Sequence, residues 1–376
     1  MATATGSFEA ASSEPVLAIG LMSGTSRDGV DAALLRTDGG ARVERGPALT
    51  LPFSPAFRER LGRVMGGRGA IAAVERDLTL IHAEAVEALL AQSGVDRREV
   101  AVIGFHGQTI LHAPEQGRTW QIGDGALLAE RTGIDVVNDF RSRDVAEGGQ
   151  GAPMVPLYHA ALAQALPRPL AVVNIGGVAN VTWIGSGGDG LLAFDTGPGN
   201  AMIDDWALRH TGRPFDSDGA LARTGRVAED VLARLLDHEY FRRPAPKSLD
   251  RDAFDPAPVA RLSPADGAAT LVAFTAATIA GAAEHFPAPV RRWLITGGGR
   301  RNPALMDALA ARLTAPVDAV EAVGWDGDAL EAQAFAYLAV RSLRGLPLSL
   351  PATTGVRRPV TGGTLHRRPR EAGRDQ

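Results

Sequence analysis

The stretch GLMSGTSRDGVD, residues 20–31, is a polar turn between two apolar segments, one beginning at Val16 and the other ending at Leu35. A turn of Asp38-Gly39-Gly40 and a third extended segment, Val43 to Phe53, follow it. Short apolar runs bounded by Gly, Asp and Ser are typical of paired strands. We therefore predict that the chain opens with a three-stranded antiparallel meander.

The same pattern returns in the second half of the chain. Leu170 to Ile175, Val178 to Ile184 and Gly190 to Phe194 are predicted strands, and the third is expected to stop at Asp195. In both halves, predicted helices and further strands follow the meander, which indicates an internal duplication. The predicted fold class is α/β, with two ribonuclease-H-like (actin-like ATPase) lobes. Each lobe is expected to hold a mixed sheet flanked by helices, with an active-site cleft between the lobes.

Length and local composition predict the domain boundaries. A chain of 376 residues is longer than one hydrophobic core usually serves. The segment Arg141 to Pro156 is rich in Gly, Pro and charge, and is the candidate passage between lobes. The predicted division is a disordered leader at 1–14, an N-terminal lobe at 15–145, a C-terminal lobe at 146–358, and a C-terminal segment with a polar tail at 359–376.

Composition also narrows the class of protein. Apolar residues make up 45% of the chain and charged residues 22%, which is the balance of a globular protein. The net charge is −4 and the basic residues form no stripe, so nucleic acid is not expected as a partner. The chain has no cysteine, which excludes disulfides and thiol chemistry.

Two segments bear on location in the cell. The first 15 residues lack the basic start and apolar core of a signal peptide. The apolar run Thr270 to Ala283 is too short and too rich in Ala and Thr to span a bilayer, so we predict a buried helix there. No membrane partner is expected, and the protein is predicted to be cytoplasmic.

The turn at residues 24–31 has the composition of a phosphate clamp. Its glycines let backbone N–H groups approach an anion, and its hydroxyls add donors. The carboxylates of Asp28 and Asp31 would repel phosphate unless Mg²⁺ intervened. Taken alone, such a turn is also what an ordinary β-hairpin needs. The candidate nucleotide contacts are Gly24, Thr25, Ser26, Arg27, Asp28, Gly29, Val30 and Asp31.

Two glycine turns in the second half could meet the same nucleotide. NIGGVAN, residues 174–180, is the equivalent hairpin turn, and GGGRRN, residues 297–302, lies between a strand and a helix. Glycines without side chains let phosphates, a base or a ribose lie close to the backbone. The alternatives are that the asparagines only cap strand ends and that the triple glycine is a plain strand-to-helix turn. The candidate contacts are Gly176, Gly177, Asn180, Gly297, Gly298 and Gly299.

Asp195 is the candidate catalytic base. It lies in FDTGPGN, residues 194–200, directly after a predicted buried strand. Phosphoryl transfer needs positioning, charge neutralisation and a carboxylate that orients or deprotonates the attacking oxygen. The alternative is that Asp195 caps a turn or the following helix.

A further polar group is expected to face a sugar. Some of its members follow two strands of the first half, and Glu331 lies on a late helix. A single histidine at a strand end is more often structural than catalytic, and a helical glutamate is by default solvated. The group comprises His106, Gln108, Thr109, Asp139, Arg141, Arg143 and Glu331.

Six stretches together closely resemble the anhydro-N-acetylmuramic acid kinases, and the resemblance runs from about Val16 to Leu365. The stretches are SGTSRDGVD at 23–31, GFHGQT at 104–109, NDFRSRD at 138–144, NIGGVAN, FDTGPGN, and ITGGGRRN at 295–302. The resemblance implies a member of the actin-like sugar kinase superfamily, with two lobes around an ATP cleft.

The resemblance also implies a double reaction on 1,6-anhydro-N-acetylmuramic acid, a product of cell-wall turnover. Water opens the anhydro bridge at C1 while O6 takes the γ-phosphoryl group of ATP, which gives N-acetylmuramic acid 6-phosphate and ADP. Asp195 would activate the water, residues 24–31 would bind the ATP phosphates, and a homodimer is compatible with the family. Mg²⁺ is expected to be held through the phosphates, with Asp28 as the one protein ligand considered. The sugar contacts would be His106, Gln108, Thr109, Arg143 and Glu331.

Two other functions use the same residues. In a hexokinase-type enzyme, Asp195 would deprotonate a free sugar hydroxyl and no bridge would be cleaved. In a non-sugar actin-like ATPase, nucleotide would drive assembly without sugar turnover.

Overall fold

The computed structural model describes residues 14–24, 26–187, 190–251 and 253–369, which form two compact units. Unit 1 takes the described residues within 1–164, 329–351 and 356–376, and unit 2 takes those within 165–328 and 352–355. Thr25, residues 1–13 of the predicted leader and residues 370–376 of the predicted tail lie outside the described residues.

The described part of unit 1 holds a seven-stranded sheet in the order β12-β6-β4-β1-β2-β3, with β5 paired to β4. The antiparallel meander β1-β2-β3 is followed by β4 and β6, which run parallel to β1 and to each other. The strands are β1 (Val16–Ser23), β2 (Gly29–Thr37), β3 (Val43–Pro52), β4 (Val100–Ala113), β5 (Arg118–Ile122), β6 (Val136–Asn138) and β12 (Thr364–His366). The helices are α1 (Pro55–Arg63), α2 (Ile71–Ser93), α3 (Gly125–Thr132), α4 (Ser142–Ala146), α5 (Pro156–Leu162) and α12 (Leu330–Leu343).

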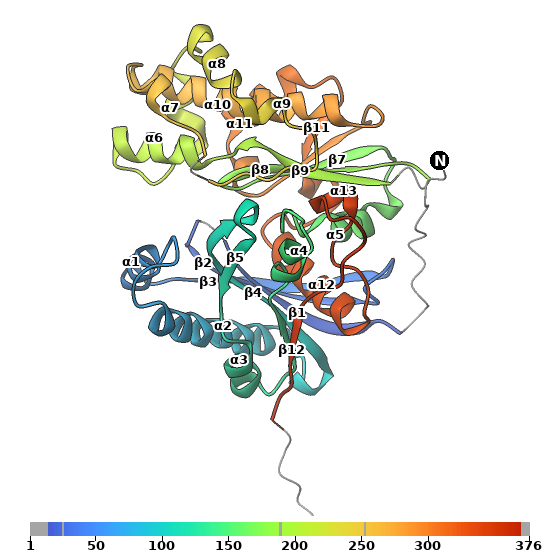
Figure 1. Cartoon of the computed structure of the whole chain (residues 1–376). Helices are drawn as coiled ribbons and strands as arrows, with labels where there is room; N and C mark the ends of the chain where they lie inside the picture. The colour runs from blue at the N-terminus through green and yellow to red at the C-terminus, as the bar shows by residue number, and fades with distance from the viewer. Residues whose placement is uncertain (1–13, 25, 188–189, 252, 370–376) are drawn as a thin grey trace, which may run out of the picture. The chain divides into compact units, whose positions relative to one another are not determined.

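Helices α2 and α12 pack on opposite faces of this sheet (Figure 1). Helix α2 buries Leu78, Val86 and Leu89 against the face that carries Ile19 and Leu21 of β1. Helix α12 lies so close to the other face that a Cβ atom on Gly20 would lie 1.7 Å from the carbonyl oxygen of Ala332. A Cβ atom on Gly104 of β4 would lie 2.0 Å from the carbonyl oxygen of Phe335. These two glycines therefore make the close helix–sheet packing of unit 1 sterically possible.

Unit 2 repeats the strand order. Its five-stranded sheet runs β11-β10-β7-β8-β9, again an antiparallel meander followed by parallel strands. The strands are β7 (Leu170–Ile175), β8 (Val178–Ile184), β9 (Leu191–Pro198), β10 (Trp293–Thr296) and β11 (Val317–Ala319). The helices are α6 (Ala201–Thr211), α7 (Ala220–Arg223), α8 (Glu229–Leu236), α9 (Glu239–Arg242), α10 (Pro264–Gly281) and α11 (Pro303–Arg312), and α13 (Pro351–Thr354) is split between the units.

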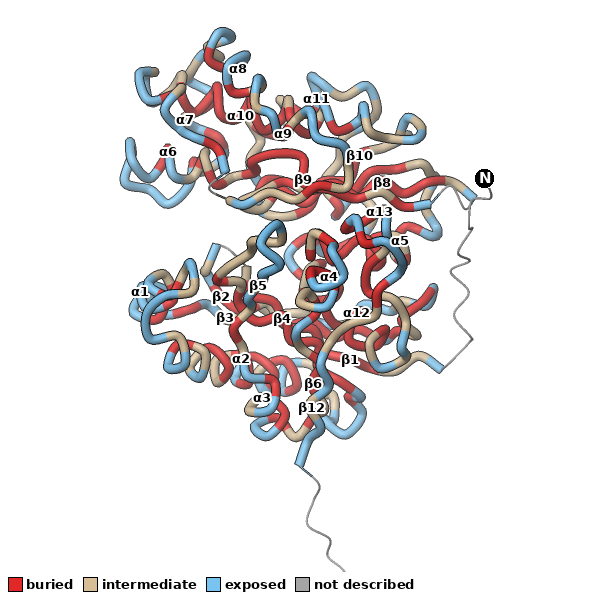
Figure 2. The backbone as a smooth tube through the Cα atoms, viewed as in Figure 1, coloured by how far each residue is buried: buried red, intermediate tan, exposed pale blue. Residues whose placement is uncertain are grey.

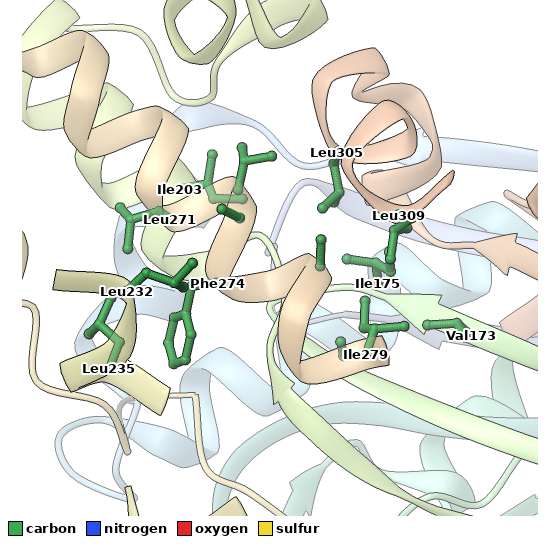
Figure 3. Packing of buried hydrophobic residues seen from close by; sticks show 14 of the residues in the cluster. Val173, Ile175, Ile203, Leu232, Leu235, Leu271, Phe274, Ile279, Leu305 and Leu309 are labelled. Carbon is green, nitrogen blue, oxygen red and sulfur yellow. The ribbon is translucent and has the colours of Figure 1, made fainter. Parts of the chain in front are cut away.

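Helix α10 is the centre of the unit 2 core. Its Phe274 and Ile279 pack with Val173 and Ile175 of β7, as Figure 3 shows. Ser263 caps its N-terminus by accepting a hydrogen bond from the Asp266 backbone N–H at 3.1 Å. Among the described residues, the segment from Pro264 to His285 is the one that could cross a membrane by length and composition, but 72% of its most apolar window is buried. Figure 2 shows α10 among the buried segments of its unit. The predicted buried helix is confirmed.

The predicted α/β class is confirmed, because both units have mixed sheets flanked by helices and share one strand order. The predicted domain boundaries differ from the observed units. The segment Arg141 to Pro156 lies wholly in unit 1, which continues to Gln164. Residues 329–351 also belong to unit 1, because α12 packs on β1, β2 and β4. The return of the chain to its first sheet was not predicted from the sequence, because α12 follows the strands of unit 2 in chain order.

Candidate active site

The loop between β1 and β2 is a compact turn in its described residues. Ser26 donates its hydroxyl to Asp28 Oδ1 at 2.6 Å, and the Arg27 N–H donates to the Gly24 carbonyl at 3.1 Å. Arg27 has a φ of 54°, in the left-handed region that favours glycine. A Cβ atom on Gly24 would find its nearest neighbour 3.7 Å away, so packing does not demand a glycine there. The turn leaves Ser26 and Asp28 exposed, where they can meet an anion and its counterion.

The flanking residues of the predicted phosphate loop have structural roles. The polar turn predicted at residues 20–31 begins later than expected, because Gly20 lies inside β1 and makes room for α12. Gly29 begins β2, and a Cβ atom there would lie 2.6 Å from the Leu51 carbonyl. Val30 is fully buried in the core, and Asp31 accepts a hydrogen bond from the Thr50 hydroxyl at 2.6 Å.

Three glycine segments of unit 2 meet at one end of its sheet. The Asn200 N–H donates to the Gly176 carbonyl at 2.7 Å, and the Gly199 N–H donates to the Gly177 carbonyl at 2.9 Å. Gly297 has a φ of 75°, and a Cβ atom there would lie 2.3 Å from Asn174 Oδ1. A Cβ atom on Gly299 would lie 2.5 Å from Ile175 Cγ2. The two predicted nucleotide turns, 176–177 and 297–299, are therefore neighbours in the fold.

A polar row crosses four strands at this end. Thr296 of β10 pairs with Asn174 of β7, Asn174 pairs with Asn180 of β8, and Asn180 pairs with Asp195 of β9. Directly paired residues on adjacent strands carry their side chains on the same face. The residues next to them, Val173, Val181 and Phe194, belong to the core that contains α10. The polar row therefore lies on the face away from α10.

Asp195 is a buried carboxylate held by backbone groups. It is 6% exposed, and its Oδ2 accepts the Leu249 N–H at 2.8 Å. The Asp195 N–H donates to the Lys247 carbonyl at 2.9 Å, and the Tyr240 hydroxyl donates to the Asp195 carbonyl at 2.6 Å. Strand β9 continues to Pro198, so the expectation that it stops at Asp195 is wrong. The carboxylate bonds to the backbone at residue 249, which lies outside α6.

The segment that bonds to Asp195 is anchored by the chain's single lysine, Lys247, which was not among the residues predicted for the site. Lys247 Nζ donates to the carbonyls of Tyr240 at 3.1 Å and Arg243 at 3.0 Å, and lies 4.7 Å from the centre of the Tyr240 ring. Burial, together with the Arg243 charge, lowers the pKa of Lys247. Burial, together with the Asp195 charge, raises the pKa of Tyr240, so its hydroxyl remains a donor. The only sequence signal was that all other basic residues of the chain are arginines.

His106, a predicted sugar contact, supports an arginine. Its Nδ1 lies 2.8 Å from the Gly107 carbonyl, and Arg141 Nε donates to its Nε2 at 3.0 Å. Because Nε2 accepts a hydrogen bond from Arg141, the ring is neutral and carries its own proton on Nδ1. Burial, together with the Arg141 charge, holds the pKa of His106 well below its ordinary value. The Arg141 Nη1 donates to the Gly151 carbonyl at 2.8 Å, so the guanidinium is held from two sides.

The other predicted sugar contacts lie in unit 1, and their side chains range from buried to exposed. Gln108 is fully buried next to His106 on β4, and its Oε1 has no hydrogen-bond partner among the residues described. The Thr109 hydroxyl accepts from Gln121 Nε2 at 3.2 Å. Arg143 is exposed on α4, and Glu331 is half-buried in the first turn of α12. His106, Gln108 and Thr109 are thus brought together on one strand, with Arg141 as the group that His106 supports.

The described residues contain no cluster of three or more His, Cys, Asp or Glu side chains that could hold a metal ion. The exposed carboxylate of Asp28 accepts the Ser26 hydroxyl. One exposed carboxylate suits Mg²⁺ that is bound mainly by phosphates, because Mg²⁺ keeps several waters and takes few protein ligands.

Comparison with known proteins identifies close relatives. The sequence model of the anhydro-N-acetylmuramic acid kinase family matches residues 16–368. The anhydro-N-acetylmuramic acid kinase of Paramagnetospirillum magneticum is 61% identical over 354 residues, which covers 93% of this chain and 99% of that protein. The enzyme of the same name from Rhodospirillum rubrum is 62% identical over 93% of this chain and 94% of its own length. Among solved structures, an activator of 2-hydroxyisocaproyl-CoA dehydratase from Clostridium difficile matches with a TM-score of 0.46 and 11% identity, covering 88% of this chain and 96% of that one.

Proposed function

The chain belongs to the anhydro-N-acetylmuramic acid kinase family, and we propose that it opens the 1,6-anhydro ring of 1,6-anhydro-N-acetylmuramic acid with water and phosphorylates O6 with ATP. It is a kinase that acts on a sugar and ATP. The products are N-acetylmuramic acid 6-phosphate and ADP, and the cytoplasm, where ATP is available, is the proposed location.

Asp195 is the proposed base. It takes a proton from water, the water oxygen bonds to C1, and the C1–O6 electron pair moves to O6. O6 then attacks the γ-phosphorus, and the bond to the β-phosphate oxygen breaks to release ADP. The observation that supports this role is a buried carboxylate whose Oδ2 is fixed by the Leu249 N–H at 2.8 Å, in a polar row on the face of its sheet away from the core. A buried, oriented carboxylate is what proton removal from a placed water needs.

The proposed ATP contacts lie in both units. In unit 1 they are the backbone and hydroxyl groups of the turn at 24–28, and in unit 2 they are the turns at 176–177 and 297–299. In support, the 176–177 turn bonds to the backbone of Gly199 and Asn200, and the glycines at 297 and 299 lie against residues 174 and 175, so glycine backbone gathers at this end of the sheet. Mg²⁺, held through the phosphates and by Asp28, would neutralise charge on the transferring group.

The proposed sugar contacts are those of unit 1, with one revision. Because His106 is neutral and accepts from Arg141, we assign the direct contact to Arg141 and a supporting role to His106. A guanidinium held in this way suits the carboxylate of the sugar's lactyl group. Gln108, Thr109, Arg143 and Glu331 remain proposed contacts.

Turnover in ¹⁸O-labelled water tests the reaction. With ATP and 1,6-anhydro-N-acetylmuramic acid, the phosphorylated product is expected to carry one ¹⁸O atom at C1. Because a reducing sugar exchanges its C1 oxygen slowly, unlabelled N-acetylmuramic acid 6-phosphate is incubated in the same water as the control. A phosphorylated product with no label above that control would reject the reaction, and so would the absence of product.

A further inference from the structure

The side-chain amide of Asn180 is an unexplained polar group in unit 2. Its Oδ1 is shielded from solvent and has no hydrogen-bond partner within the described parts of the chain. Buried polar oxygens in native proteins are nearly always paired with protein, water or ligand. A bound water or ligand can therefore supply the donor that this oxygen lacks among the described residues.

Asn180 lies beside the proposed base. Strands β8 and β9 are adjacent in the sheet (Figure 1), and Asn180 is directly paired with Asp195. The β-carbons of directly paired residues are about 4.5–5.5 Å apart, so one water molecule can reach both side chains. The register between the strands shifts between Ala179 and Asn180, and such bulges re-aim side chains next to active sites. The orphan oxygen thus faces the same small region as the carboxylate.

We infer that Asn180 is the second group that holds the attacking water. This inference rests on the proposed role of Asp195. One water hydrogen is donated to Asp195, and the other is donated to Asn180 Oδ1. With both hydrogens held, a lone pair of the water oxygen points at C1.

The step balances with these two groups alone. The water O–H bond that points at Asp195 breaks, and its proton passes to that carboxylate. The bond between C1 and the water oxygen forms as the C1–O6 bond breaks. The other hydrogen remains on the new C1 hydroxyl, which still donates a hydrogen bond to Asn180 Oδ1. A neutral amide suits this position better than a second carboxylate, because a like charge would raise the pKa of Asp195.

This role differs from the nucleotide contact that the sequence suggested for Asn180. The Gly176-Gly177 turn that would face phosphate precedes β8, whereas Asn180 lies within β8 opposite the base. A nucleotide contact would affect the KM for ATP. A water contact would affect kcat and the choice of nucleophile.

Methanol as a competing nucleophile tests the inference in the full-length protein. Methanol has one O–H hydrogen for Asp195 and carries a methyl group where water has its second hydrogen. In Asn180→Ala the methyl group fills the space of the deleted amide, so the ratio of methyl glycoside 6-phosphate to hydrolysed product is expected to rise at least about 10-fold. The kcat for hydrolysis is expected to fall about 10- to 100-fold, since one transition-state hydrogen bond is lost. The KM for ATP should stay within about twofold.

Asn174→Ala is the matched control, since Asn174 lies in the same row one strand further from Asp195. It is expected to leave the methanol ratio unchanged. Asn180→Asp keeps the acceptor and the side-chain volume, so it tests the idea even if Asn180→Ala folds poorly. In Asn180→Asp, the acidic limb of the pH profile of kcat should move to higher pH, because the added charge raises the pKa of Asp195. Its plateau kcat should exceed that of Asn180→Ala, because the acceptor is kept.

A methanol ratio in Asn180→Ala equal to that of the unmodified protein would overturn the inference. A plateau kcat of Asn180→Asp as low as that of Asn180→Ala would do the same. The failure of the proposed function looks different: Asp195→Asn would remain active, or no label would enter C1. If both of those tests support the base while the methanol ratio is unchanged, only the role of Asn180 is wrong.

Discussion

Replacing Lys247 with methionine should raise the pKa of the proposed base, Asp195. The ammonium of Lys247 bonds to the carbonyls of Tyr240 and Arg243, and the same segment supplies the Leu249 N–H to Asp195 Oδ2. Methionine keeps the length of the side chain but leaves those two carbonyls without their donor. The segment around residues 243–249 should loosen as a result.

The expected size follows from the bond to Asp195. An N–H group that donates to a carboxylate stabilises its charged form, and loss of one such bond raises the pKa of the acid by about one unit, or about 1.4 kcal/mol. Asp195 would then be fully ionised only at higher pH. The acidic limb of the kcat/KM profile for the anhydro sugar should therefore move up by about one pH unit.

The assay is a pH profile of kcat/KM in a coupled ADP assay, with the ATP KM measured in parallel. Lys247→Arg, which keeps a charge and donors, should restore part of the profile. Arg234→Met removes an exposed cation on α8, whose side chain is 62% exposed, and serves as the surface control. An acidic limb in Lys247→Met that coincides with that of Arg234→Met would refute the reasoning.

Four further outcomes are expected. Asp195→Asn should lower kcat by about 10²- to 10⁴-fold while calorimetry shows ATP binding retained; near-normal turnover would remove Asp195 as the base. Gly20→Ala should destabilise unit 1 by about 3 kcal/mol or more in urea unfolding, because its Cβ would lie 1.7 Å from the Ala332 carbonyl. Gly24→Ala should fold normally but raise the ATP KM, and equal stability of the two alanine variants would contradict this. Burial lowers the pKa of His82 to about 4, so the unfolded chain binds more protons and stability should fall as pH drops from 6.5 towards 4; His82→Asn should flatten that slope.

Local pattern was sufficient for the repeated meander, and it made Asp195 a candidate base. Paired strands and their turns depend on neighbouring residues, so the runs around residues 20–31 and 174–180 predicted the antiparallel meander of each sheet. Asp195 became a candidate because it is an acidic residue that follows a run of apolar residues, although the strand continues past it to Pro198. These features are local in sequence and need no knowledge of distant contacts.

Tertiary structure decided the features that depend on distant segments. Gly20 serves the packing of α12, which lies more than 300 residues later in the chain, so sequence alone placed it in the polar turn at residues 20–31. His106 accepts a hydrogen bond from Arg141, and the Lys247 carbonyl accepts one from the Asp195 N–H. Each contact requires two separated backbone segments to meet, so sequence alone could not predict it. The placement of Asn180 opposite Asp195 likewise follows from strand register, and register becomes known only when the sheet is formed.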